Sequence, residues 1–191
     1  MADGERWRVA IVDDHERSRA ALRTVIRAAG GAVVGEAARR ADALHAITRT
    51  AADVAIIAVG LPDGDGVSVA SDAANAGCPV VLFTSHTSDA LVRRASDAGV
   101  MGYLVKPLRA PELAPALDIA VARFRESRDL RRALTERKVV ERAKGVLMAR
   151  HGFTEDEAFR RLRRAAMDTR RPMVDVARAL LVSDAVVPAR T

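Results

Sequence analysis

Five short apolar segments, each followed by a stretch with helical spacing, recur between residues 7 and 105. Short apolar strands that alternate with helices are typical of βαβ units and of a parallel sheet covered by helices on both faces. The sequence therefore predicts an α/β fold, a doubly wound five-stranded parallel sheet within residues 1–110. The five segments are WRVAIV (7–12), AVVGEA (32–37), DVAIIAVG (53–60), PVVLFT (79–84) and MGYLV (101–105).

The ends of these predicted strands carry polar side chains. In an open parallel sheet, ligands bind outside the carboxyl ends of the strands. Two carboxylates, a hydroxyl and an ammonium group that meet at this edge predict a polar site. The strand-end residues are Asp13, Asp14, Ala58, Thr84 and Lys106.

The segments IVDDHE, LPDGDG, FTS and GYLVKP resemble, in this order, the motifs of the receiver domain of bacterial response regulators. The resemblance covers about residues 7–125 and implies a flavodoxin-like fold and a sensor histidine kinase as a possible partner. In such domains two carboxylates hold a divalent cation, which prefers oxygen ligands. A hydroxyl and a lysine bind the phosphoryl oxygens, and an aromatic side chain rotates on phosphorylation. The residues at these positions are Asp13 and Asp14, Thr84 and Lys106, and Tyr103.

The position of the phosphoryl acceptor departs from the receiver pattern. Counting back from Leu61, the acceptor should be residue 58, which is an alanine. A methyl group can neither attack phosphorus nor ligate a metal, so we expect no phosphotransfer here and no required cofactor. A Mg²⁺ site at Asp13 and Asp14 would be weakened. The alternative is that these carboxylates and Lys106 form a salt-bridged cluster that holds the strand ends together; whether Ala58 is natural or engineered stays open.

From Pro111 the alternation of strands and helices stops. A single Pro and no Gly lie between Leu113 and Gly145, which predicts a long helix from about Leu113 to His151. Residues 111–129 would continue the last receiver helix as a coiled-coil linker. A parallel seam between two copies is favoured over packing within one chain, because an exposed connector of this length needs its apolar stripe covered. The expected seam residues are Leu117, Val121, Phe124 and Leu130.

Two further helices are predicted near the C-terminus. The segment TEDE has the residues of a capping box and begins a helix that runs to Met167. Pro172 fits the first turn of a last helix, to about Leu181. Together with the end of the long helix, these elements predict a small three-helix α domain over residues 130–184, followed by a tail at 185–191.

Positive charge is concentrated in this C-terminal part of the chain. Residues 128–191 hold 16 Lys+Arg and 9 Asp+Glu, a net charge of +7, whereas the whole chain carries +6. Such an asymmetry indicates a polyanionic partner for this part alone. Only three of the 31 basic residues are lysines, so a general arginine bias explains the charge equally well.

The sequence of residues 130–182 resembles the ANTAR domain, an RNA-binding module of transcription antiterminators. The resemblance implies binding to tandem hairpins in nascent transcripts, which would prevent an overlapping terminator hairpin from forming, and no enzymatic activity. Two hairpins and one domain per chain imply a homodimer. The matching pieces are Arg137, ERAKG followed by Leu147-Met148, Ala158-Phe159, Leu162-Arg163, Ala166-Met167 and DVA (175–177).

Four residues of this domain are expected to contact RNA: Arg137, Lys144, Gly145 and Arg163. Arg137 and Lys144 are seven residues apart and share one helical face; the alternative for Lys144 is a salt bridge alone, to Glu141 or Glu136 of the same or a partner helix. Gly145 costs about 1 kcal/mol relative to alanine inside a helix, which suggests close approach by a second helix, the favoured reading, or by RNA. By its spacing Phe159 is expected in the core, and Phe153 is a weaker stacking candidate, for which a hydrophobic staple is an equally good explanation. Weaker phosphate contacts are expected from Arg160, Arg161 and Arg164.

Two other functions stay open, a DNA-binding response regulator and a phospho-independent dimerisation or signalling module. The first is disfavoured because one very long helix precedes the C-terminal domain, unlike a compact helix-turn-helix. No apolar run reaches the roughly 18–20 residues that span a bilayer, the N-terminus lacks a signal pattern, and Cys78 is the single cysteine. We expect a cytoplasmic protein; the regulated transcripts and the input signal stay open.

Overall fold

The computed structural model describes residues 5–186 of the chain. The chain divides into two compact units, Met1–Glu126 and Ser127–Thr191. This division falls close to residue 130, where the sequence predicts the start of the C-terminal domain. No helix within residues 5–186 is both long enough and apolar enough to span a membrane.

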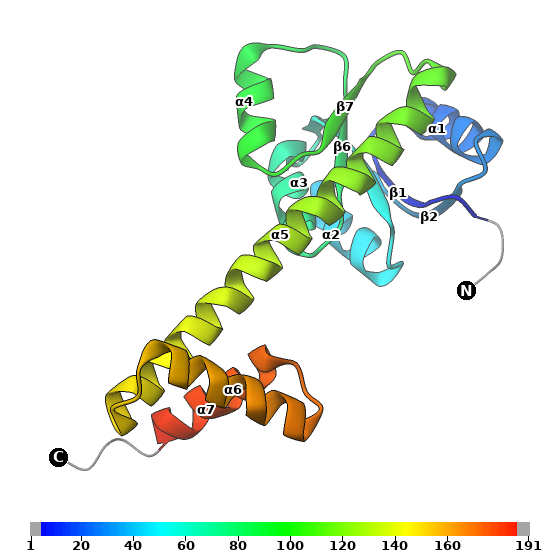
Figure 1. The fold of residues 1–191 in the computed structure, drawn as a ribbon. Coiled ribbons are helices and arrows are strands. Elements are labelled where there is room, and N and C mark those ends of the chain that lie inside the picture. Colours follow the sequence, from blue (N-terminus) through cyan, green and yellow to red (C-terminus); the bar gives the residue numbers. More distant parts are fainter. Residues whose placement is uncertain (1–4, 187–191) are drawn as a thin grey trace. The chain divides into compact units, whose positions relative to one another are not determined.

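The first unit is built on a five-stranded parallel sheet with the strand order β2-β1-β3-β6-β7 (Figure 1). In the centre of the sheet, Ile11 pairs with Ile56 and Ile57 pairs with Leu82, and these side chains are fully or almost fully buried. The predicted doubly wound α/β sheet is thus confirmed. Its strands are β1 (Arg8–Val12), β2 (Ala32–Ala37), β3 (Val54–Ala58), β6 (Val80–Thr84) and β7 (Gly102–Val105).

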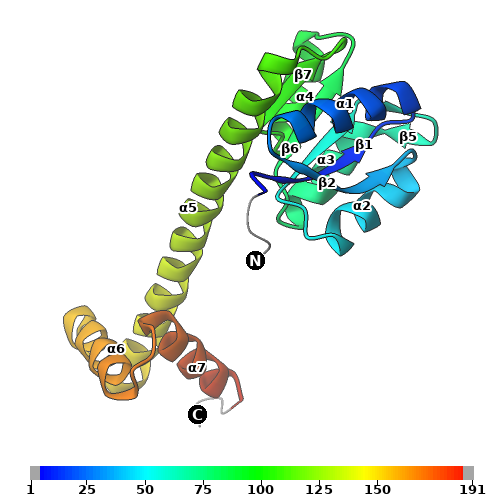
Figure 2. The same ribbon diagram turned by 90° about the vertical axis from the view of Figure 1, so that its right-hand side faces the viewer.

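Successive strand residues point to opposite faces of the sheet, and each face has its own helices. Val9 and Ile11 pack with α1 and the beginning of α5, whereas Ala10 and Val12 pack with α2, α3 and α4. Figure 2 shows the sheet between these two layers. Because both faces of the sheet are covered by helices, the strands consist of nearly continuous apolar residues. The helices are α1 (Glu16–Ala28), α2 (Arg40–Arg49), α3 (Gly66–Asn75), α4 (Asp89–Asp97) and α5 (Ala110–His151).

The beginning of α5 corrects the predicted dimer seam. Leu117 is fully buried and Val121 packs against the same core cluster, on the face of the sheet that α1 also covers. Phe124 is also buried, at 8% exposure. These three residues are therefore core residues of their own unit, because a doubly wound sheet needs its last helix to cover an open face. Of the four expected seam residues only Leu130 is exposed, at 63%.

The loop after β3 contains a two-stranded hairpin that the sequence did not predict, formed by β4 (Gly60–Leu61) and β5 (Gly64–Asp65). Both aspartates of this hairpin accept hydrogen bonds from backbone N–H groups at the start of a helix. The carboxylate of Asp63 accepts hydrogen bonds from the backbone N–H groups of Arg40 (2.7 Å) and Ala41 (3.1 Å), which lowers the pKa of Asp63. Asp65 caps the beginning of α3. The loop thus fixes the start of two helices beside the strand ends.

The second unit contains the end of α5 together with α6 (Glu155–Thr169) and α7 (Met173–Val186). The predicted capping box is confirmed, since Thr154 and Glu157 exchange both of its hydrogen bonds. A small apolar cluster from all three helices forms the core. The last helix continues beyond the predicted end at Leu181 to Val186; residues 187–191 of the predicted tail lie outside the described residues. The core residues are Val140, Ala143, Leu162 and Ala177.

Candidate nucleic-acid interface and receiver pocket

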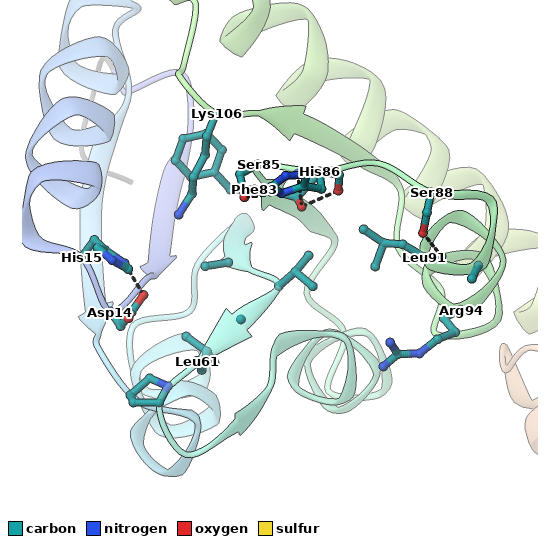
Figure 3. Close-up of a pocket in the computed structure, with 16 residues that line it drawn as sticks. Asp14, His15, Leu61, Phe83, Ser85, His86, Ser88, Leu91, Arg94 and Lys106 are labelled. Carbon is teal, nitrogen blue, oxygen red and sulfur yellow. Dashed lines mark hydrogen bonds and ion pairs between the residues drawn. The ribbon is translucent and has the colours of Figure 1, made fainter.

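A hollow of about 670 Å³ lies at the carboxyl ends of the strands of the first unit, and it brings together several of the predicted site residues. Figure 3 shows Lys106 and the Asp14–His15 pair on one side and Arg94 of α4 on the other. Ala58 and Thr84 also line the hollow. The expected strand-end site is therefore present as a pocket.

The charges of this pocket are paired within the chain. The ammonium of Lys106 lies 2.6 Å from Oδ2 of Asp13, whose side chain is 1% exposed. The other oxygen of Asp13 accepts a hydrogen bond from the backbone N–H of His15 at 2.9 Å. Oδ1 of Asp14 lies 2.6 Å from Nδ1 of His15. Each carboxylate thus has a partner in the protein, which agrees with the salt-bridged cluster considered above.

Thr84 lines the strand-end pocket, whereas Tyr103 does not. The hydroxyl of Thr84, at the end of β6, donates a hydrogen bond to the carbonyl of His86 at 2.7 Å and is buried. Tyr103, on β7, is 54% exposed and is not among the residues that line the pocket. Only Thr84 of the two is therefore directed to the strand-end site.

The floor of the pocket is apolar where the receiver pattern has a carboxylate. Ala58 is the last residue of β3 and is buried, with a side chain that ends at Cβ. The start of α3 lies so close to it that a Cβ on Gly66 would come within 1.9 Å of the Ala58 carbonyl oxygen, so this position requires glycine. The methyl group of Ala58 therefore lines the pocket at a point where α3 packs closely against β3.

These residues do not fit a divalent cation well. Asp13, Asp14 and His15 could place ligand atoms within 4.8 Å of one another. Their carboxylates already bond to Lys106 and to His15, and a methyl group at Ala58 supplies no third oxygen. Mg²⁺ needs an oxygen-rich, near-octahedral set of ligands, so no chemistry of this site is assigned to a metal.

Three residues that line the pocket were not predicted from the sequence: His15, His86 and Arg94. His15 and His86 follow the strand ends by a few residues, and this position in the loops is a signal that could have identified them. Arg94 lies within α4 and reaches the pocket from there, where it pairs with Asp65 at 2.5 Å. The sequence contains no signal for that contact.

In the second unit, Lys144 is buried, which contradicts the expected exposure of this residue and agrees with the alternative of a salt bridge to Glu141. The side chain is 8% exposed, and its ammonium lies 2.8 Å from Glu141 and 2.7 Å from Glu155. These two carboxylates raise the pKa of Lys144. Glu141 is one turn earlier on α5, whereas Glu155 is the first residue of α6, so Lys144 joins the two helices.

Gly145 and Phe159 also differ from expectation. Among residues 5–186, a Cβ on Gly145 would meet nothing within 4 Å, so no second helix of the described chain packs closely against this position. Phe159 is 39% exposed and is not a core residue. The buried stripe of α6 runs through Ala158 and Leu162, and Phe159 lies beside it.

Arg137 on α5 and Arg163 on α6 are exposed, as an RNA contact requires. Within residues 5–186 neither of them forms an ion pair, and the same is true of Arg160 and Arg161. No hydrogen bond joins the side chain of Arg137 to Arg163 or to Gly145 within residues 5–186. The second unit thus offers exposed guanidinium groups that form no direct ion pair within residues 5–186.

A third group of residues lies at the turn between α5 and α6. The rings of His151 and Phe153 are stacked, with centroids 5.3 Å apart and planes inclined by 24°. The guanidinium carbon of Arg161 lies 5.3 Å from the centroid of the Phe153 ring. Phe153 is half-buried, so this weaker stacking candidate of the sequence is placed at the surface.

Two domain families match the chain. The response regulator receiver domain matches residues 9–118, and the ANTAR domain matches residues 128–181. The first match includes the strand-end pocket, and the second includes the ion-paired Lys144, the exposed arginines and the stacked rings.

Two known regulators are similar to this chain, one over nearly its whole length and one over a short part of it. The transcriptional regulatory protein PdtaR of Mycobacterium tuberculosis is 41% identical over 182 residues, which cover 91% of this chain and 89% of PdtaR. The nitrate regulatory protein of Klebsiella oxytoca is 49% identical over 57 residues, 30% of this chain and 14% of that protein.

A solved structure resembles the first unit. The receiver domain of the putative response regulator NarL from M. tuberculosis superposes with a TM-score of 0.57 at 30% sequence identity, over 62% of this chain and 98% of that structure. From the two domain matches and the likeness to PdtaR over nearly the whole length, the chain belongs to the response regulators that join a receiver domain to an ANTAR domain.

Proposed function

We propose that this protein regulates transcription by binding RNA through its C-terminal unit, as an antiterminator that holds paired hairpins in a nascent transcript. Binding would stabilise the hairpin pair and so prevent an overlapping terminator hairpin from forming. Proteins recognise RNA mainly at loops and unstacked bases, which hairpins present. A nascent transcript as ligand places the protein in the cytoplasm.

The observation that carries this proposal is the set of unneutralised arginines within the matched ANTAR domain. Arg137 and Arg163 are exposed and form no ion pair within residues 5–186. Guanidinium groups in this state can neutralise phosphates and release condensed counterions. Lys144 is excluded from this set, because its charge is already shared between Glu141 and Glu155.

For the receiver unit we propose a role that does not involve phosphotransfer. The strand-end pocket has its lysine, its hydroxyl and its acidic pair, and a methyl group where the acceptor carboxylate would be. A sensor histidine kinase could dock on such a surface without transferring a phosphoryl group to it. The receiver would then serve binding or dimerisation, with two protomers presenting one ANTAR domain to each hairpin.

A titration of the full chain tests the RNA proposal. The ligands are an RNA with two stem-loops, the same RNA with one stem-loop deleted, and a DNA duplex of equal length, each at two salt concentrations. We expect tightest binding to the two-hairpin RNA and a steep loss with salt, because each neutralised phosphate adds about −0.7 to −0.9 to the slope of log K against log salt.

Two variants and one control test which arginines contact the RNA. Arg137→Ala and Arg163→Ala should each weaken RNA binding and reduce the salt slope. Arg93→Ala, an exposed arginine of α4 in the receiver unit, is the matched control and should leave the affinity unchanged. Tighter binding to the DNA duplex than to the RNA would reject the proposal in favour of a DNA-binding regulator.

A further inference from the structure

A second hollow lies on the C-terminal unit, at the turn between α5 and α6. Its volume is about 320 Å³, which accommodates one planar base. Residues at spacings of three and four on α6 share one helical face. Four residues of this face line the hollow together with the ring of Phe153. The lining residues are Phe153, Glu157, Arg160, Arg161 and Arg164.

The aromatic wall is already part of a stack. The ring of Phe153 is in contact with two planar groups, the His151 ring at a centroid distance of 5.3 Å and the guanidinium carbon of Arg161 at 5.3 Å. His151 and Arg161 are exposed, whereas Phe153 is half-buried. Both the aromatic ring and the guanidinium plane are surfaces on which an unpaired base can stack.

The charge of the hollow also suits a nucleotide. Arg160 and Arg161 form no ion pair within the described part of the chain, and Arg164 reaches Asp168 only at 4.0 Å on an exposed surface. The one carboxylate of the hollow, that of Glu157, is held by the capping box, where it accepts hydrogen bonds from the backbone N–H (2.8 Å) and hydroxyl (2.9 Å) of Thr154. The hollow thus combines three guanidinium groups and an aromatic ring with one acid, which is hydrogen-bonded to Thr154 and also interacts electrostatically with Arg160 and Arg161.

We propose that this hollow holds one unpaired base of the bound RNA, stacked on the Phe153–Arg161 pair, with the flanking phosphates on Arg160 and Arg164. The inference rests on the proposed RNA-binding function and adds a specific subsite to it. An aromatic surface flanked by basic groups is the usual means of binding single-stranded nucleic acid. An acidic peptide would use the arginines but would gain little from the ring, so RNA is the ligand that the whole hollow favours.

The test replaces the loop bases of the two-hairpin RNA one at a time by abasic nucleotides and measures the affinity of the full chain by fluorescence anisotropy. For the unmodified protein, we expect one abasic position to weaken binding roughly tenfold, the usual contribution of one stacked base. Phe153→Leu should weaken binding to the intact RNA by a similar factor. The same abasic position should then have little further effect on the variant.

Arg161→Lys is a second test of the subsite, and it leaves the half-buried ring of Phe153 unchanged. It keeps the positive charge and removes the planar group, so it should also abolish the effect of that abasic position. Arg142→Lys is the matched control, because Arg142 is an exposed arginine of the same unit that lies on α5 outside the hollow. With this control the abasic RNA should still bind roughly tenfold more weakly, as with the unmodified protein.

The possible outcomes separate this subsite from the function on which it rests. If the protein binds the intact RNA and every abasic RNA equally well, the subsite is wrong while RNA binding stands. If it does not bind the intact RNA, both proposals fail. If polyglutamate displaces the RNA from the unmodified protein and not from Phe153→Leu, the hollow is a peptide site and the base assignment is rejected.

Discussion

The ammonium nitrogen of Lys144 on α5 lies 2.7 Å from a carboxylate oxygen of Glu155, the first residue of α6. Lys144 is buried, and the same ammonium bonds to Glu141 at 2.8 Å. The contact crosses the turn at Gly152, where the chain has a positive φ of 68°. This ion-paired lysine therefore links the beginning of α6 to the end of α5, in addition to the apolar cluster that the three helices share.

Substitution of Lys144 should destabilise the C-terminal unit. Lys144→Met removes the shared partner of Glu141 and Glu155 and disturbs the junction of the two helices, so we expect a melting temperature lower by several degrees, measured by calorimetry on the full chain. Lys138→Met, an exposed lysine on the same helix, is the control and should leave the melting temperature unchanged. Equal melting temperatures for both variants would contradict a structural role for Lys144.

The Lys144–Glu155 pair should also make stability depend on pH. Lys144 lowers the pKa of Glu155 below its ordinary value of 4.5, so the pair stabilises the fold above that pH and the contribution is lost as the pH falls through the lowered pKa. The pKa of Lys144 is raised above 10.5, so its contribution is present below that pH and is lost only as the pH rises through the raised pKa.

This dependence can be measured from melting temperatures in a pH series. The difference between the unmodified protein and Glu155→Gln should be present at neutral pH and should shrink as the pH falls below 4.5, the ordinary pKa of the carboxyl group. Asp156→Asn changes the next acidic residue of the same helix turn and is the control for the interaction of charge with the helix dipole. A difference that grows in acid would have the wrong sign for this ion pair.

The receiver fold could be predicted because its signals are local and repeated. Five apolar strands alternate with helices, and the strand ends carry Asp13, Thr84 and Lys106 in the required order. In a parallel sheet the strand ends must meet at one edge, so the pocket followed from the order of the strands. Arg94 was not predictable, because its approach depends on where α4 packs.

The errors concern residues whose environment depends on which helix covers which surface. Leu117 and Val121 have the spacing of a coiled-coil seam, yet that stripe covers the sheet instead. Lys144 has the spacing of an exposed basic face, yet its partner Glu155 lies eleven residues later, beyond a turn. A helical repeat shows that a face is distinctive, and only the packing shows what that face contacts.

Restoring the acceptor carboxylate should restore phosphorylation. Ala58 ends β3 in the pocket that Thr84 and Lys106 also line, so an aspartate there would add the missing third oxygen ligand and the nucleophile. We expect Ala58→Asp, incubated with acetyl phosphate and Mg²⁺, to gain one phosphoryl adduct by intact-mass spectrometry. The unmodified protein and the Ala58→Asn control should gain none. A stoichiometric, acid-labile adduct on the unmodified protein would refute the assignment of position 58.

Dimer formation should depend on the exposed leucines near the start of the second unit. Leu130 and Leu134 are 63% and 53% exposed, and their spacing of four places them on one face of α5. Burying a leucine contributes about 1.5–3 kcal/mol, so two copies that pair these side chains gain a substantial apolar interaction. In Leu130→Glu a charge occupies this face, and the dimer dissociation constant should rise roughly tenfold or more.

Light scattering coupled to size exclusion measures this change for the full chain, with and without the two-hairpin RNA. Val182→Glu alters an equally exposed side chain, at 65%, on α7 and should leave the oligomeric state unchanged. Leu117→Glu should instead unfold the receiver unit, because Leu117 is fully buried in its core. If the unmodified protein stays monomeric at all concentrations and also on RNA, the paired leucines cannot be a dimer seam, and each hairpin would have to be bound by an independent chain.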